Sequence, residues 1–451
     1  MKRLIQLFAL MLLTIQPMAA QPQTRGFFGD LLDYYKESAM INIDGWFSGR
    51  ANFSDSWSRS FMVYYDSYDG QKNKVKLSAK VYYDKRLDGW LDFTDIKHIL
   101  LNCHPTVTTN LEAPSGSKPL DVDVSRMVGE DGHSYLIVCP DYCGYGVTPQ
   151  MQHPYLIHDV TARNCVDAVL AAIEAAKKRG ISISDDYTTD IIGYSQGGAT
   201  ALACAKYLES DACPIEIKQK IKLRQTACGD GPYSTYATVM QYMEWGDPTR
   251  SDGGMDLDYP CVLPLIVAAA KEAYNNGCMR TVDVEDYFTE DFLQTDIIRL
   301  LKTKSIGTDD LNARIIENMA RRRPIDIFSE ALIDKATGKF KEDSNLYKCL
   351  MRAMDIADLS KGWKPTHPIW FFHLKSDRVV PYSNLEAVKN GIMKDYPTLV
   401  HNVEPEDAHE SAYSIVKSAK KLSDVKFDKV DHSLGGVIFY MDYMFGDKLH
   451  E

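Results

Sequence analysis

The sequence predicts an α/β protein in which a mostly parallel central sheet is flanked by helices, with a helical insertion between late strands. Short, nearly continuous apolar runs such as Ile96–Cys103 alternate with stretches of helix-forming residues such as Asp159–Gly180. This alternation is typical of strands that are buried on both faces and joined by crossover helices. Between residues 232 and 364 the strand patterns disappear and helical patterns dominate. The 451 residues, 45% of them hydrophobic, are enough for a large core with such an insertion.

The first twenty residues have the pattern of a secretory signal peptide. Lys2 and Arg3 precede a short apolar run at Leu4–Ile15, and small residues around Ala20 offer a cleavage site. The run is too short to span a bilayer comfortably, although an uncleaved anchor is the alternative interpretation. We therefore expect a secreted or periplasmic chain that has no membrane span once the signal peptide, residues 1–20, is removed.

The core is expected in two segments, residues 21–231 and 365–451, on either side of an insertion at residues 232–364. Ser60–Asp84 is expected to form a β-hairpin, because β-branched and aromatic residues flank a Gly-Gln-Lys-Asn turn. Later apolar runs are expected to be strands within Ser134–Gly146, Ile221–Gly231, His367–Asp377 and Asp424–His432. The insertion is interpreted as a helical cap, with a separate second domain as the alternative.

The composition argues against several classes of function. The formal net charge of −11 becomes more negative when the two basic residues of the signal peptide are removed, which argues against nucleic acid as a partner. The sequence has no P-loop and no H-E-x-x-H motif, and Cys139 and Cys143 are too few for a zinc site without nearby partners. Asp252–Asp258 is interpreted as an exposed acidic loop rather than a calcium site, and Arg321–Pro324 as a solvated helix end. We therefore expect no cofactor and no metal, and the sequence leaves the oligomeric state open.

The ten cysteines of an exported chain could form disulfides. Four that occur in apolar strand or helix patterns are expected to be buried thiols: Cys103, Cys139, Cys165 and Cys204. Four that occur in more loop-like contexts are favoured for disulfides: Cys213, Cys228, Cys261 and Cys278.

A candidate nucleophile lies in Gly193–Gly197, which reads G-Y-S-Q-G between an apolar strand pattern and an alanine-rich helix pattern. A sharp strand-to-helix turn requires unusual backbone angles, and small neighbours relieve the crowding around the central serine, Ser195. The hydroxyl of Ser195 is then presented above the sheet edge, with a helix N-terminus beneath it. In such a turn the amide of Gln196 points at the carbonyl oxygen of an attacked substrate. The alternative interpretation is an ordinary tight turn.

A serine nucleophile needs a base and a carboxylate that orients the base. After a serine in a G-x-S-x-G turn between a strand and a helix, the acid comes next in the chain and the histidine follows it. Asp377 ends the predicted strand His367–Asp377, which is the expected position of the acid. We favour His432 as the base, because it follows a strand-like run and precedes a glycine pair and an apolar helix. His409 is the alternative, although the residues before it are too charged for a buried strand, and His401 is a weaker one.

The second donor to a substrate oxyanion is expected in the loop after the third strand, which reads N-C-H-P-T-V-T-T. Pro105 has no amide hydrogen, so a neighbouring residue must donate. We favour Thr106 for this role, and His104 is the alternative.

Four motifs, in this order, resemble those of the α/β-hydrolases: "CPDYCGYG" with "HPYL" shortly after it, "GYSQGG", "SDRVVP" and "DHSLGG". More narrowly, the chain resembles exported lipases and esterases with a helical cap, the secretory lipase-like branch, over residues 60–450. The resemblance implies acyl hydrolysis through a covalent serine intermediate, with Ser195 as nucleophile, Asp377 as orienting acid and His432 as base. The segment "CHPT" departs from the "HG"-type oxyanion loop that is usual in the superfamily.

The favoured function is therefore an exported serine hydrolase that cleaves carboxylic esters, of a small molecule or a lipid, through an acyl-enzyme on Ser195. A serine peptidase of the prolyl or aminoacyl type would use the same three residues, but residues 21–58 are too short for the extra domain that selects peptides. A catalytically silent binding protein on the same fold is a third hypothesis, and the complete serine, aspartate and histidine set argues against it.

Overall fold

The computed structural model describes residues 58–84, 95–120, 135–274, 278–415, 427, 430–445 and 449. The predicted signal peptide and residues 21–57 of the predicted core lie outside the described residues. Among the helices that are described, none is both long enough and apolar enough to cross a membrane.

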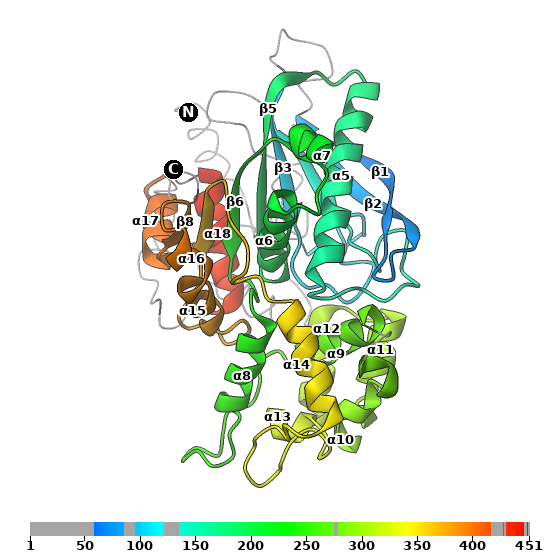
Figure 1. Ribbon diagram of the computed structural model, residues 1–451, viewed down its shortest axis with the longest axis vertical. Coiled ribbons are helices and arrows are strands. Elements are labelled where there is room, and N and C mark those ends of the chain that lie inside the picture. The colour runs from blue at the N-terminus through cyan, green and yellow to red at the C-terminus, as the bar shows by residue number, and fades with distance from the viewer. Residues whose placement is uncertain are drawn as a thin grey trace, which may run out of the picture.

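The described core is built on an eight-stranded sheet (Figure 1). Its strands are β1 (Ser58–Tyr68), β2 (Lys74–Asp84), β3 (Ile96–Cys103), β4 (Tyr135–Pro140), β5 (Ile183–Tyr194), β6 (Leu223–Gly229), β7 (Ile369–Phe372) and β8 (Val400–Val403). Their order in space is β1-β2-β4-β3-β5-β6-β7-β8. β2 pairs antiparallel with β1 and β4, and the other neighbouring pairs are parallel. The predicted fold class, α/β with a mostly parallel sheet, is confirmed.

The sequence patterns account for the strands that position the site. The hairpin expected at Ser60–Asp84 is confirmed, and Asp69 closes its turn by accepting the N–H groups of Gln71 and Asn73 at 2.9 and 2.8 Å. In β3, Leu101 packs into the core on one face of the sheet and Leu100 into the core on the other. A continuous apolar run is therefore required there, because both faces of the strand are buried.

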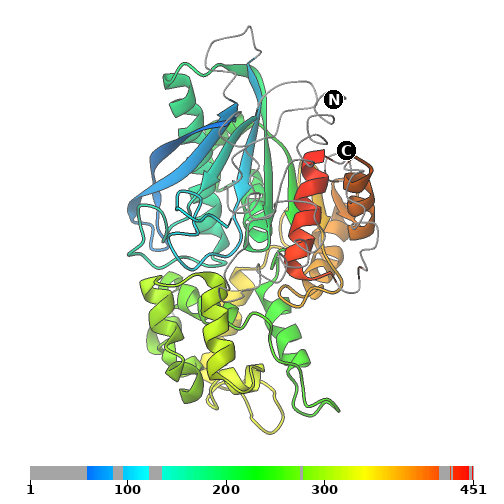
Figure 2. The ribbon, with the colours of Figure 1, turned by 180° about the vertical axis from the view of Figure 1, so that it is seen from behind.

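Helices cover both faces of the sheet (Figures 1 and 2). In the core they are α5 (His158–Lys178), α6 (Gln196–Glu209), α7 (Ile215–Ile221), α15 (Ser383–Asn390), α16 (Ile392–Asp395), α17 (Pro405–Ile415) and α18 (His432–Phe445). The small residues Ala162 of α5 and Ala199 of α6 belong to the core on one face. Val437 and Phe439 of α18 join the core on the opposite face. The crossover helix predicted at Asp159–Gly180 corresponds to α5.

The last strand differs from the prediction. The described part of Asp424–His432 is not a strand, because Val430 is irregular and His432 already begins α18. The sheet instead ends with β8, which comes before His409. Among the described strands β8 pairs with β7 alone and lies at the edge of the sheet, so the half-buried polar residues in its sequence V-H-N-V are tolerated.

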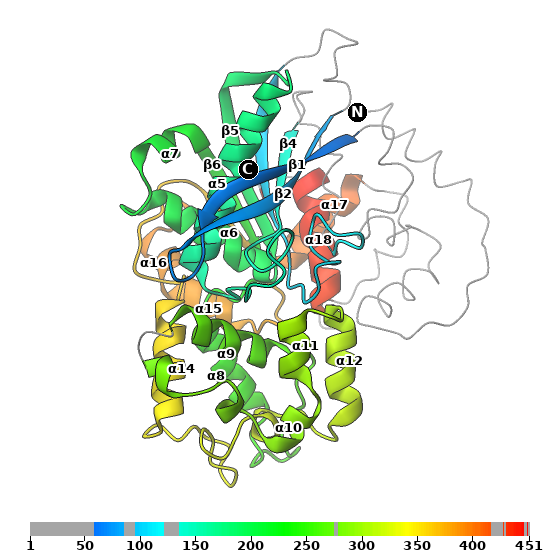
Figure 3. The same cartoon turned by 90° about the vertical axis from the view of Figure 1, so that its right-hand side faces the viewer.

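A layer of helices lies between β6 and β7 in the chain, where the sequence predicted a helical insertion (Figure 1). It contains α8 (Thr235–Trp245), α9 (Val262–Ala273), α10 (Glu290–Gln294), α11 (Ile297–Thr303), α12 (Thr308–Asn318), α13 (Pro324–Ile327), α14 (Asn345–Ile356) and 3₁₀ turns at Cys278–Thr281 and Glu285–Tyr287. The layer sits below one end of the sheet in Figure 1, and α11 and α12 face the loops that follow β3 and β4 (Figure 3). Two buried side chains join the layers: Glu112 of the core accepts the Thr308 N–H at 2.8 Å, and Lys304 of the insertion donates to the Pro149 carbonyl at 2.8 Å.

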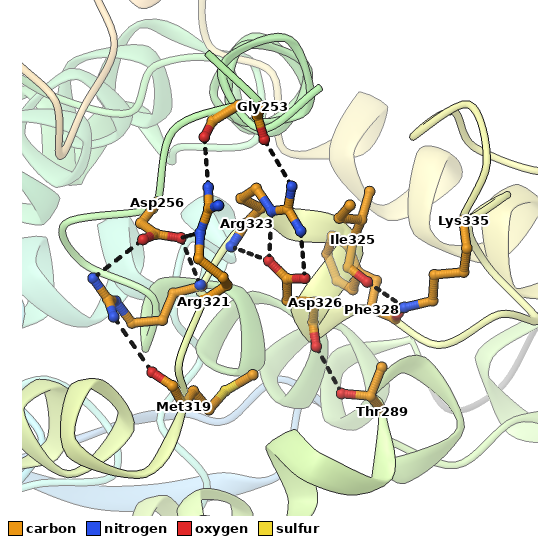
Figure 4. A network of polar contacts seen from close by, with 12 residues as sticks. Gly253, Asp256, Thr289, Met319, Arg321, Arg323, Ile325, Asp326, Phe328 and Lys335 are labelled. Atoms are coloured by element: carbon orange, nitrogen blue, oxygen red, sulfur yellow. Dashed lines mark hydrogen bonds and ion pairs between the residues drawn. The ribbon is translucent and has the colours of Figure 1, made fainter. Parts of the chain in front are cut away.

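The acidic loop and the arginine run of the insertion bind each other (Figure 4). Asp256 accepts the Nε–H of Arg321 at 3.0 Å and the backbone N–H of Arg322 at 2.7 Å. Arg323 forms two hydrogen bonds to Asp326 and donates to the Gly253 carbonyl at 2.7 Å. The expectation of a fully solvated helix end was therefore wrong for Arg322 and Arg323, which are half-buried, because the opposite charges meet only after folding.

The disulfide expectation was also wrong for three cysteines. Cys213, Cys228 and Cys261 are free and buried, and the four cysteines expected to be buried thiols are buried as predicted. Cys228 lies on β6, where its side chain packs in the core. Cys349 is the described cysteine that is disulfide-bonded. The side chain of Cys278 lies outside the described residues.

Candidate active site

Ser195 occupies the turn between β5 and α6. Its backbone angles, φ 58° and ψ −126°, are strained for a residue with a side chain. A Cβ on Gly193 would lie 2.2 Å from the carbonyl oxygen of Gly197, and a Cβ on Gly197 would lie 2.0 Å from the carbonyl oxygen of Cys103. The two glycines therefore permit both the sharp turn and the close approach of the loop that follows β3.

Asp377 lies in the loop after β7 and is almost completely buried. Its Oδ1 accepts the backbone N–H groups of Val379 and Val380 at 2.7 and 2.8 Å. These two donors stabilise the carboxylate and orient it, so that Oδ2 is directed at a histidine from a distant part of the chain. The next residue, Arg378, pairs with Asp258 of the insertion at 3.1 Å, which ties this loop to the helical layer.

His432 is the first residue of α18, and its Nδ1 lies 2.5 Å from Asp377 Oδ2. Burial lowers the pKa of His432, but the adjacent Asp377 carboxylate and its hydrogen bond outweigh burial, so that the net shift is upward. With Nδ1–H donated to Asp377, the neutral ring keeps an unprotonated Nε2 that can accept a proton.

Ser195 and His432 line the same pocket, a cavity of about 70 Å³. Most of its lining is apolar or aromatic and comes from both layers of the protein. The core contributes Pro105, Thr106, Leu120, Tyr155, Leu156, Tyr194, Ser195, Val379, Val380, His432, Ser433, Gly436 and Tyr440. The insertion contributes Pro232, Thr238 of α8, Tyr259 and Val262, the first residue of α9. Such a pocket suits an apolar group bound beside a small number of polar atoms.

The two oxyanion candidates after β3 lie in different surroundings. Thr106 lines the pocket, and its hydroxyl lies 3.2 Å from the hydroxyl of Tyr155. His104 is outside the pocket lining, with its ring stacked 3.8 Å from the ring of Tyr142. Burial lowers the pKa of His104 to about 4, so its ring is neutral. Gln196 begins α6, where the first N–H groups have no partner within the helix.

The other candidate bases lie elsewhere. His409 is in α17, where its ring contacts Phe427 at a centroid distance of 5.5 Å. His401 is on β8 and stacks on Trp370 at 4.5 Å. Neither histidine lines the pocket, whereas His432 does.

Sequence reasoning missed two supporting residues. His153 is buried outside the pocket, and its Nε2 accepts the Gln196 side-chain N–H at 2.7 Å. Its Nδ1 donates to the carbonyl of Cys143 at 2.9 Å. His153 thereby joins the "CPDYCGYG" and "HPYL" motifs next to Gln196, the residue that follows Ser195. The second is Asp230, a completely buried acid after β6. The signal for it was an acidic residue near the end of the apolar run predicted as a strand within Ile221–Gly231.

Two groups of described residues bring three potential metal ligands within 4.8 Å of one another: Cys103, Cys165 and Cys204, and Asp230, His373 and Asp377. All six residues are buried. In the second group both oxygens of Asp377 already accept hydrogen bonds from protein groups.

Solved structures of other proteins share this arrangement of strands and helices. A ligand-bound form of the rice cell wall degrading esterase LipA from Xanthomonas oryzae aligns over 87% of this chain and 91% of its own, with a TM-score of 0.62 and 18% sequence identity. The chain has the α/β-hydrolase fold. Candida antarctica lipase A in its closed state aligns over 86% of this chain and 87% of its own, at a TM-score of 0.50 and 11% identity. No protein-family model and no curated protein sequence matches the chain.

Proposed function

We propose that this protein is a carboxylic ester hydrolase in which Ser195 is the nucleophile, His432 the general base and Asp377 the residue that orients the base. The observation that carries the proposal is geometric. His432, bonded to Asp377 at 2.5 Å, lines one pocket together with Ser195, although the three residues come from three separate parts of the chain. A serine in a strained strand-to-helix turn, with a base and an orienting acid nearby, is the arrangement that acyl transfer requires.

The proposed reaction has two halves. Ser195 Oγ attacks the ester carbonyl while His432 Nε2 takes its proton, and His432 then returns the proton to the leaving alcohol. Water, activated by the same nitrogen, attacks the acyl-enzyme, and the acid product leaves Ser195 free. The backbone N–H groups of Gln196 and Thr106 are proposed to hold the oxyanion in both tetrahedral intermediates.

We propose that the inserted helices cap the active site and select the substrate. Support comes from Thr238, Tyr259 and Val262 of the insertion, which line the same pocket as Ser195 and His432. The apolar lining favours an ester with an apolar acyl or alcohol group. Export of the protein is proposed on the pattern of residues 1–20 alone.

The decisive experiment replaces the nucleophile. Ser195→Ala should lower kcat for short and medium p-nitrophenyl esters by about 10⁴-fold or more, and it should abolish labelling by a fluorophosphonate probe. Aminoacyl-proline amides assayed in parallel should be cleaved far more slowly than the esters by the wild-type enzyme.

A matched control is Ser210→Ala at the other end of α6, where the hydroxyl donates to the Tyr207 carbonyl at 2.8 Å. This variant should label and hydrolyse esters as the wild-type protein does. Full activity in Ser195→Ala, or preferred cleavage of the amides, would contradict the proposal.

A further inference from the structure

Asp230 lies at the centre of the site, although no step of the proposed reaction uses it. Its side chain is completely buried, and its Oδ1 accepts the N–H of Leu374 at 2.7 Å. Its Oδ2 lies within hydrogen-bond distance of the hydroxyl of Tyr194. Tyr194 immediately precedes Ser195, and Leu374 begins the loop that carries Asp377. Asp230 therefore joins the chain segments that hold the proposed nucleophile and the proposed acid.

The Tyr194 hydroxyl has a second oxygen neighbour, the backbone carbonyl of His432 at 2.5 Å. A phenol carries one proton and a carbonyl oxygen carries none. If Asp230 were ionised, the two contacts among these three oxygens would share one proton, and one contact would be a repulsion between lone pairs. A proton on Asp230 satisfies both contacts, because Asp230 then donates to Tyr194 and Tyr194 donates to His432.

The glycine pair of the "DHSLGG" motif makes room for these contacts. A Cβ on Gly435 would lie 2.5 Å from Tyr194 Oη and 2.9 Å from Asp230 Oδ2. A Cβ on Gly436 would lie 3.1 Å from the ring of Tyr194. Both glycines lie in the first turn of α18, so their lack of side chains allows this helix to approach Tyr194 and Asp230 while it presents His432.

Titratable groups from several parts of the chain face Asp230. They are Tyr194 from the end of β5, Tyr233 after β6, His373 and Asp377 after β7, and His432 at the start of α18. Burial is the largest cause that raises the pKa of Asp230, and the Asp377 carboxylate raises it further, while His432 and Tyr194 oppose the shift.

His373 supplies no compensating cation. Its Nε2 lies 3.7 Å from Asp230 Oδ1 but donates to the Val380 carbonyl at 3.0 Å. Burial lowers the pKa of His373 to about 4. Its Nδ1 has no hydrogen-bond partner among the described residues, as expected for a neutral ring with its proton on Nε2.

Resting on the function proposed above, we propose that Asp230 is a protonated acid at neutral pH and a positioning residue for the site. It donates to Tyr194, which donates to the His432 carbonyl, while its other oxygen holds Leu374. Of the two neighbouring buried acids, Asp377 accepts two backbone N–H groups and the N–H of the His432 ring, whereas Asp230 accepts one backbone N–H. The His432 ring is then influenced by a single carboxylate, that of Asp377. The uncharged hydrogen-bond chain from Asp230 through Tyr194 holds the backbone of His432 in place.

The test compares Asp230→Asn, Asp230→Ala and Tyr194→Phe. The asparagine amide can donate to Tyr194 and accept from Leu374, so Asp230→Asn should keep kcat within about threefold of wild type, with the acid limb of the pH–rate profile unmoved. Asp230→Ala and Tyr194→Phe should lower kcat by about 10- to 100-fold with little change in KM. The infrared difference spectrum between wild type and Asp230→Asn at neutral pH should contain the carbonyl stretch of a protonated carboxylic acid.

Asp190→Asn is the matched control, because Asp190 is a buried aspartate of β5 that pairs with Arg224 at 2.8 Å. It should lower stability, leave the acid limb in place and remove no acid carbonyl band. An ionised Asp230 would give the opposite result for Asp230→Asn, namely an acid limb moved to lower pH and no acid band. Full kcat in Tyr194→Phe and Asp230→Ala would overturn the positioning role.

If Asp230→Ala fails to fold, Asp230→Asn, Tyr194→Phe and the infrared band still decide the question. A wild-type protein that neither cleaves esters nor labels with the fluorophosphonate contradicts the proposed function and the positioning role together. The infrared band tests the protonation of Asp230 without any enzymatic assay, so that part of the inference can stand or fall by itself.

Discussion

Two parts of this molecule bury charged side chains, and they stabilise them by different means. At the carboxyl edge of the sheet, Asp377 is bonded to His432, and the neighbouring Asp230 contacts the hydroxyl of Tyr194. At the joint between the core and the inserted helices, Glu112 and Lys304 are bonded almost entirely to hydroxyl groups and to backbone N–H and carbonyl groups. Both parts use backbone donors, but the first also pairs a carboxylate with a histidine ring, whereas the second relies on hydroxyl groups and backbone dipoles.

The joint illustrates how backbone groups support a buried charge. Glu112 Oε2 accepts the Thr108 N–H at 3.0 Å and the Thr308 hydroxyl at 2.8 Å, and Oε1 accepts the Thr308 N–H at 2.8 Å. Thr308 begins α12, so the carboxylate lies at the positive end of a helix dipole. Lys304 donates to the carbonyls of Pro149 and Met151. The Glu112 contacts connect the insertion to the loop that carries Thr106, and the Lys304 contacts connect it to the loop after β4.

This difference predicts different consequences of substitution in the two parts. A backbone donor cannot give up its proton at working pH, so the joint can hold the insertion without taking part in a reaction. The reaction proposed for the edge of the sheet requires a group that changes protonation state, and a histidine bonded to a carboxylate can supply it. Substitutions at the edge should therefore act on rate, and substitutions at the joint should act on stability.

Among the substitutions that compare these two parts, Asp377→Asn should have the largest effect, a loss of rate. The amide facing His432 would donate to Nδ1, which forces the ring proton onto Nε2, so the ring cannot take the proton of Ser195. We expect kcat to fall by about 10³- to 10⁴-fold with little change in the free energy of unfolding. Steady-state kinetics with urea unfolding of the same sample measure both. A loss of stability large enough to explain the loss of rate would show that Asp377 acts on stability, as the joint does.

The next effect is that of Glu112→Gln on stability. A glutamine has one acceptor oxygen, so its NH₂ group must face at least one of the donors that Glu112 now accepts. We expect the free energy of unfolding to fall by about 1–3 kcal/mol, while kcat stays within about threefold of wild type. The exposed Glu174→Gln on α5, which breaks a surface pair with Lys178, is the control and should leave the unfolding midpoint unchanged. A collapse of kcat at full stability in Glu112→Gln would show that the joint takes part in catalysis.

The smallest effect is a displacement along the pH axis. His432 must be neutral to act as a base, and its pKa is raised above the ordinary value of 6.5. Activity should therefore fall as pH drops, with the midpoint of the acid limb of kcat/KM above pH 6.5. The residual activity of Asp377→Asn should show this limb at lower pH, because the interaction that raises the pKa of His432 is lost. Glu112→Gln should leave the limb in place. A shift of the limb in this variant would show that the joint also influences the pKa of His432.

The sequence was informative wherever a short segment carries its own geometric requirement. The turn around Ser195 could be predicted because the glycines and the helix pattern are local, and the structure gives Ser195 the strained backbone that such a turn requires. Asp377 was predictable because an acidic residue directly after a buried strand lies at the edge of the sheet. The choice of His432 rested on the helix that it begins, and the structure brings this histidine to Asp377.

Prediction failed where contacts join segments that are far apart in the chain. The strand expected before His432 was wrong, because an edge strand needs only one apolar face and β8 satisfies this with a half-polar sequence. The pairing of Asp256 with the arginine run could not be foreseen, because about 65 residues separate them in the chain. The disulfide expectation failed for Cys228, whose apparent loop turned out to be part of the buried strand β6.

By itself the sequence determined the α/β class, the strained serine turn and the order in which an acid and a histidine follow it, because periodicity and turn chemistry act over a few residues. Only the tertiary structure decided which histidine meets Asp377 and which residues of the insertion line the pocket. It also decided that the Tyr194 hydroxyl contacts both Asp230 and the His432 carbonyl in one buried cluster. These features depend on where separate chain segments pack, and local propensity contains no information about that.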